Sequence, residues 1–167
     1  LNNVLSLNSA IALQRGELDR ARKINRELLQ RLINGKSLGD LKKRAKATME
    51  LASIAASQDD FNDATKLAEL TIANLTVGQG LPGIDKTIFL EGLIQAHELL
   101  AFSYEKLGNA AKSAEYKAAL PPLKAALEKK QQAESANTPP SDAPADKGDD
   151  TSSYQFDKFT LWPPTEM

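Results

Sequence analysis

The chain has no cysteine, which excludes disulfide bonds, thiolate zinc sites and cysteine nucleophiles. Its single histidine, His97, is too few for a histidine-based metal site and lacks the partners of a catalytic triad, so we expect it at the edge of a core. No run of 18 apolar residues is present, which predicts that no segment spans a membrane. The motifs HExxH, GxSxG and the Walker loop are also missing. We therefore predict a protein that is not an enzyme and uses no metal or cofactor.

Aromatic residues are scarce, and none occurs between residues 1 and 60. Alanine and leucine dominate instead, which favours helices over sheets. Proteins that bind single-stranded nucleic acid interleave aromatic side chains with cations, so this scarcity argues against sequence-specific RNA or DNA binding. The chain starts at Leu1 with no initiator methionine and no visible signal peptide, so we interpret it as intracellular, cytoplasmic or nuclear, and as a processed product or a fragment.

The most regular stretch lies between Ala45 and Leu75. Apolar and small residues recur there at steps of three and four, which predicts two helices joined by a turn at residues 58–60. Asp59 or Asp60 is expected to cap the second helix. Gly16 and Gly108 align with Asp59 at two further turns. Small residues repeat around all three turns: Ser9, Ala52 and Ala101 seven residues before, and Ala21, Ala64 and Ser113 five residues after.

This pattern resembles the tetratricopeptide-type repeats over roughly residues 1 to 120. The resemblance implies an all-α fold in which antiparallel helical hairpins, about 1–33, 38–75 and 85–120, stack as a short α-solenoid. The turns lie 43 and 49 residues apart, which is longer than the roughly 34 residues of the standard repeat. A generic antiparallel helical bundle is the alternative.

Two segments interrupt the pattern. Residues 76–85 contain Gly78-Gln79-Gly80-Leu81-Pro82-Gly83, which matches a dinucleotide-binding motif but follows a helix instead of a strand, so we predict a flexible loop. A helix from Asp85 to Leu107 is expected next. Pro121 and Pro122 are expected to end the sixth helix and to open a capping helix at 122–133, which closes a domain spanning 1–134.

The C-terminal part changes in composition. Residues 135–153 are rich in Pro, Ser, Ala and Asp and predict a disordered acidic linker. Residues 154–167 contain four of the nine aromatic residues and predict a docking segment. This segment could fold back on its own solenoid, dock into another subunit or remain an unconstrained end. The residues expected to bind are Tyr154, Phe156, Phe159 and Trp162.

Charge is unevenly distributed. Between Arg15 and Lys46 there are eleven Lys or Arg and four Asp or Glu, while the whole chain has a net charge of −1. A basic segment of this kind suits an acidic partner, although it is also an ordinary solvated surface. The candidate anion-binding residues are Arg15, Arg22, Lys23 and Arg26, and the candidate partner-binding residues are Asn8, Lys42, Lys43 and Lys46.

Three functions fit these observations. The preferred one is a protein–protein interaction scaffold or adaptor subunit of a larger assembly, which binds a partner segment in the solenoid groove and through the aromatic tail. The second is an RNA- or ribonucleoprotein-associated protein that uses the basic residues of 15–46. The third is a structural subunit whose repeats continue in a neighbouring chain.

Overall fold

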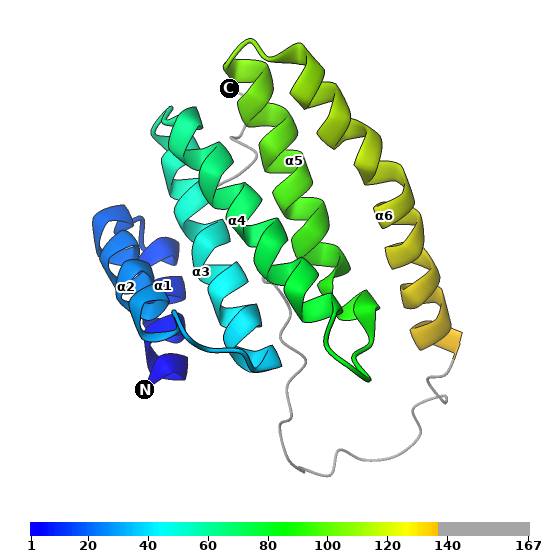
Figure 1. Ribbon diagram of the computed structural model, residues 1–167. Coiled ribbons are helices and arrows are strands. Elements are labelled where there is room, and N and C mark those ends of the chain that lie inside the picture. The colour runs from blue at the N-terminus through cyan, green and yellow to red at the C-terminus, as the bar shows by residue number, and fades with distance from the viewer. Residues whose placement is uncertain (137–167) are drawn as a thin grey trace.

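A computed structural model describes residues 1–136, and these residues are helical with no strand. The prediction of an all-helical domain is confirmed for this part of the chain. Its three hairpins lie side by side in chain order in Figure 1. The first pairs α1 (Asn2–Gln14) with α2 (Leu18–Arg31), the second α3 (Leu38–Ser57) with α4 (Phe61–Gln79), and the third α5 (Leu90–Lys106) with α6 (Ala110–Ala136). A short 3-10 helix, η1 (Lys86–Phe89), precedes α5.

The three turns share one backbone geometry. Gly16, Asp59 and Gly108 have positive φ angles of 71°, 59° and 73°. In the first turn the amide of Gly16 donates to the carbonyl of Leu13 at 2.9 Å, and the amide of Glu17 donates to that of Ala12 at 2.9 Å. The same pair of bonds recurs after α3 and α5. This arrangement satisfies carbonyls that the helix end leaves free, and aspartate is among the few residues besides glycine that tolerate the left-handed conformation.

Small residues let the two helices of each hairpin approach closely. The positions seven residues before and five residues after the turn are buried in all three hairpins. In the third hairpin the hydroxyl of Ser113 also donates to the carbonyl of Ala101 at 2.9 Å, which joins α6 to α5 directly. The small residues that the sequence pattern singled out therefore lie at the helix crossings.

Helix α3 is the central element. Every residue from Ala47 to Ala56 is buried. Towards the first hairpin, Ile54 packs with Ala12 and Ala21, whereas towards the third hairpin Met49 packs with Leu99. Burial of apolar side chains on both sides of α3 stabilises the stacking of the hairpins, at about 25 cal/mol per Å² of apolar surface removed from water.

The segment after α4 differs from the prediction. The expected flexible loop at 76–85 starts later, because α4 continues to Gln79 and buries Gly78. A β-carbon at Gly78 would lie 2.8 Å from Cζ of Phe89, so only glycine leaves room for that ring. Asp85 is a cap as predicted, accepting a hydrogen bond from the amide of Thr87 at 2.9 Å. The helix that it begins is η1, however, and α5 starts at Leu90 instead of Asp85.

The predicted break at Pro121 and Pro122 is corrected as well. Helix α6 runs without interruption from Ala110 to Ala136, so there is no separate capping helix at 122–133. Both prolines are exposed, as are Lys117 and Ala118, whose carbonyls lose their usual amide donors. Water can satisfy these carbonyls on the exposed side, which removes much of the penalty for proline inside a helix.

None of the helices in residues 1–136 is both long and apolar enough to cross a membrane. The predicted linker at 135–153 begins later than expected, because α6 includes residues 135 and 136. The rest of the linker, and the docking residues Tyr154, Phe156, Phe159 and Trp162, lie outside the described residues.

Candidate functional site

The predicted anion-binding residues divide into two groups. Arg22 is half-buried and engaged: its guanidinium donates to the side-chain oxygen of Gln58 and lies 3.7 Å from the carboxylate of Asp19. Arg15, Lys23 and Arg26 are exposed, and within residues 1–136 none of them forms an ion pair. Arg22 therefore belongs to the contact between the first two hairpins, and only the other three cations are available to a ligand.

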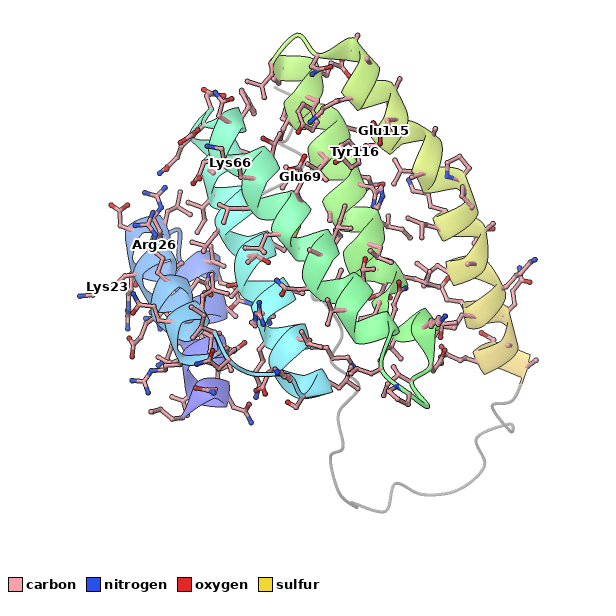
Figure 2. The ribbon with its side chains drawn as sticks, in the orientation of Figure 1. Lys23, Arg26, Lys66, Glu69, Glu115 and Tyr116 are labelled. Carbon is pink, nitrogen blue, oxygen red and sulfur yellow. The ribbon has the colours of Figure 1, made fainter. Side chains whose placement is uncertain are left out.

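Lys23 and Arg26 lie three residues apart on α2, which places them on one helix face. Figure 2 shows both on the α2 side of the molecule, away from the third hairpin. Arg15 stands at the C-terminal end of α1. Two other cations of the basic segment are neutralised, because Arg20 pairs with Glu17 at 2.7 Å and Arg31 pairs with Glu27 at 2.8 Å. We define Lys23 and Arg26 as the α2 basic face.

The predicted lysines of α3 do not form one surface. Lys42 is half-buried and lies 6.0 Å from the centre of the Phe89 ring. Burial and the neighbouring Lys130 lower the pKa of Lys42. Lys46 stands instead beside a buried carboxylate, 4.0 Å from Oε1 of Glu50. The remaining two predicted residues, Lys43 on α3 and Asn8 on α1, are half-buried.

Glu50 was not singled out from the sequence, yet it joins three helices. Its Oε2 accepts hydrogen bonds from the hydroxyl of Ser9 on α1 at 2.6 Å and from the amide of Asn25 on α2 at 2.7 Å. The side chain is only 3% exposed, and its Oε1 accepts no hydrogen bond within the described residues. Burial raises the pKa of Glu50, while the bonds from Ser9 and Asn25 and the charge of Lys46 oppose this shift.

A second polar cluster, also missed, connects α4, α5 and α6. The hydroxyl of Tyr104 donates to Oε1 of Glu69 at 2.6 Å and accepts from Nζ of Lys112 at 2.9 Å. Tyr116 stacks on Tyr104 with ring centres 5.7 Å apart, and its own hydroxyl lies 3.3 Å from Glu69. Tyr116 and Glu69 lie beside each other in Figure 2. His97, half-buried as predicted, completes the cluster edge-on to Tyr116 at 5.6 Å.

The hydrogen bonds and charges of this cluster hold α4, α5 and α6 together. Burial, followed by the negative charge of Glu69, raises the pKa of Tyr116 to about 12, so its phenol stays neutral. The hydrogen bond with Tyr104 raises the pKa of Lys112, which keeps that amine protonated. Neither shift prepares a group for proton transfer near neutral pH. In residues 1–136 no group of three or more His, Cys, Asp or Glu side chains could hold a metal ion.

Sequence signals for the two clusters were present but weak. Glu50 is an acidic residue inside an otherwise small and apolar stripe of α3, at the position where the third hairpin has Leu99. Tyr104 replaces an alanine of the other hairpins, Ala12 and Ala55. A residue that departs from the repeat in size or charge thus marks a place where helices from different hairpins meet.

Comparisons with protein-family models, with curated proteins and with solved structures found no match to this chain.

Proposed function

We propose that the chain is a protein–protein interaction scaffold that binds an acidic segment of its partner on the α2 basic face. The observation that carries this proposal is the pair of exposed cations, Lys23 and Arg26, neither of which forms an ion pair within the described residues. Their neighbours along the helix, Arg22 and Arg31, are both paired. Exposed cations on one rigid helix can steer and orient a negatively charged partner.

The repeated hairpins support the scaffold part of the proposal. Stacked hairpins that share one turn geometry are typical of extended binding proteins. We propose that these hairpins form a tetratricopeptide-like solenoid whose groove also contacts the partner. The aromatic docking segment at 154–167 remains a further predicted contact for the same assembly.

RNA is the alternative ligand of the α2 basic face. The phosphate backbone would be attracted by the same cations. Helices α1, α2 and α3 contain no Phe, Tyr or Trp, however, so they offer no ring on which a base could stack. We therefore favour an acidic peptide over a nucleic acid.

The experiment compares a fluorescein-labelled glutamate-rich peptide with labelled poly-uridine by fluorescence anisotropy at 50 and 200 mM salt. We expect the peptide to bind, and the double variant Lys23→Glu/Arg26→Glu to weaken its binding at least about tenfold, since each reversal turns attraction into repulsion. Lys66→Glu is the matched control, because Lys66 is an exposed cation on α4 (Figure 2). Stronger binding of poly-uridine would favour the RNA alternative, and binding of neither probe would overturn the proposal.

A further inference from the structure

Helix α1 carries an apolar stripe that faces solvent. Val4 and Leu7 are 54% and 62% exposed, and Leu1 before them is 78% exposed. Val4, Leu7 and the half-buried Ile11 follow one another at steps of three and four, so they lie on one face of the helix. We call these three residues the α1 face. The first 14 residues contain no Asp, Glu, Lys or Arg, a depletion of charge that is typical of the cores of protein interfaces.

The positions equivalent to the α1 face in the other two hairpins are packing positions. Val4, Leu7 and Ile11 stand twelve, nine and five residues before the turn residue Gly16. The residues at the same distances before Asp59 and Gly108 are all buried: Ala47, Glu50 and Ile54 on α3, and Ala96, Leu99 and Ser103 on α5.

These buried equivalents hold each hairpin against the one before it. Ala47 packs with Leu28 and Leu32 of α2, and Ile54 packs with Ala12 and Leu13 of α1. On α5, Ala96 and Leu99 pack with the second hairpin. Helix α1 therefore exposes the same face that α3 and α5 use for packing against neighbouring helices.

The opposite end of the stack is closed to such packing. In the second hairpin, four apolar residues pack in the clusters that contain α5: Met49, Ala56, Ala68 and Leu75. At the equivalent positions the third hairpin has Glu98, Glu105, Lys117 and Lys124. These form two ion pairs between α5 and α6, Lys117–Glu105 at 2.6 Å and Lys124–Glu98 at 2.7 Å.

The closed end determines which contact is available to two copies. The α1 face of one copy cannot pack against the third hairpin of another without burying these ion pairs, whose desolvation is unfavourable. A head-to-tail array is therefore disfavoured, whereas the same face of a second copy is apolar and uncharged and can meet the α1 face without burying an ion pair.

We propose that two copies of the chain associate through their α1 faces, related by a two-fold axis. An uncharged apolar stripe is self-complementary, because no like charges meet across the axis. Helix α1 has 13 residues and is about 20 Å long at 1.5 Å per residue, so the contact is small and the dimer dissociates at micromolar concentrations. This surface is separate from the α2 basic face, and the proposal does not depend on the binding of an acidic partner.

Sedimentation equilibrium of the 167-residue chain at about 1 to 200 µM tests this proposal, a range chosen to bracket the affinity of a small interface. We expect a monomer–dimer equilibrium, and Leu7→Glu should raise the dissociation constant at least about tenfold because it places two carboxylates near the axis. Val77→Glu is the matched control, since Val77 is an exposed apolar residue on α4 at 58% exposure and its replacement should leave the equilibrium unchanged.

The uncharged variant Val4→Gln/Leu7→Gln should also weaken the dimer, and circular dichroism verifies that each variant retains the helix content of the original chain. High salt should leave the dimer intact, because an apolar contact is not screened. A monomer at every concentration would overturn the proposal, as would a dimer that neither Leu7→Glu nor Val4→Gln/Leu7→Gln weakens, or one that Val77→Glu weakens as much as Leu7→Glu does. Either result leaves the α2 basic face untouched, since that surface is tested with a different pair of residues.

Discussion

Replacing Asn25 with alanine should lower the free energy of unfolding by about 3 kcal/mol, because it leaves a buried carboxylate with one partner fewer. Asn25 and Ser9 supply the two hydrogen bonds that Oε2 of Glu50 accepts, and they come from the two helices of the first hairpin. The loss should therefore weaken the attachment of that hairpin to α3. Urea unfolding followed by circular dichroism measures the effect.

A second substitution distinguishes a stranded charge from a simple loss of contact. Asn25→Ala combined with Glu50→Leu reproduces the pair found between the second and third hairpins, where Ala68 and Leu99 belong to one apolar cluster. We expect the double variant to be more stable than Asn25→Ala alone, since replacing a buried charge by a hydrophobic side chain is often neutral or stabilising. Equal destabilisation in the single and double variants would show that Glu50 is not the reason.

Phe89→Ala is expected to cost about 3 to 5 kcal/mol, because it empties a site in which the ring is completely buried. Phe89 packs with Ala45 on α3, Leu75 on α4 and Leu93 on α5, so the cavity would lie where three helices meet. Thermal and urea unfolding both report this loss. A change below about 1 kcal/mol would contradict the packing, since surface substitutions are usually in that range.

The partner position, Gly78, gives the matched test of this contact. Alanine is the better helix former by about 1 kcal/mol, yet Gly78→Ala should destabilise because its β-carbon would approach the Phe89 ring to 2.8 Å. In the background of Phe89→Ala the clash disappears, and Gly78→Ala should then be neutral or stabilising. A destabilisation of the same size in both backgrounds would show that the glycine acts by another route.

The turns could be predicted from sequence because their causes are local. A left-handed residue at each helix end needs glycine or a residue such as aspartate, and small residues at fixed distances are needed where two helices cross. Gly16, Asp59 and Gly108 satisfy the first condition, and the alignment around them identified the three hairpins. The helix ends that flank the three turns therefore agreed with expectation, whereas the start of α5 and the end of α6 did not.

The sequence-based predictions were wrong where the local structure depends on residues far away in the chain or on exposure to solvent. Gly78 was expected in a flexible loop as part of the glycine-rich segment 76–85. It lies in α4 instead, where the ring of Phe89, eleven residues away, leaves no room for a β-carbon. Pro121 and Pro122 were expected to end a helix, but exposure of the flanking backbone makes them tolerable. The exposure of individual backbone carbonyls cannot be predicted from a single sequence.

The candidate sites show the same division. Exposure of Lys23 and Arg26 followed from their place on the polar side of α2, whereas the engagement of Arg22 with Gln58 requires the second hairpin to be in position. The hydrogen bonds to Glu50 join residues 41 and 25 positions apart, so no local pattern announces them. Hydrogen-bond partners that come from another hairpin can be identified only in the folded structure.

Each of the second and third hairpins docks against the one before it through equivalent positions of its own first helix, α3 or α5. Because the chain contains no cysteine, pairs of engineered cysteines test it directly. Ser9→Cys/Glu50→Cys joins the first hairpin to the second, and Ala52→Cys/Leu99→Cys places the pair at the equivalent positions of the second and third. Because all four positions are buried, the pairs are tested by refolding the reduced chain under mild oxidation, and we predict that both form intramolecular disulfide bonds, while Ser9→Cys/Leu99→Cys, which joins non-adjacent hairpins, does not. Cross-linking of the third pair, or failure of either of the first two, would contradict the account.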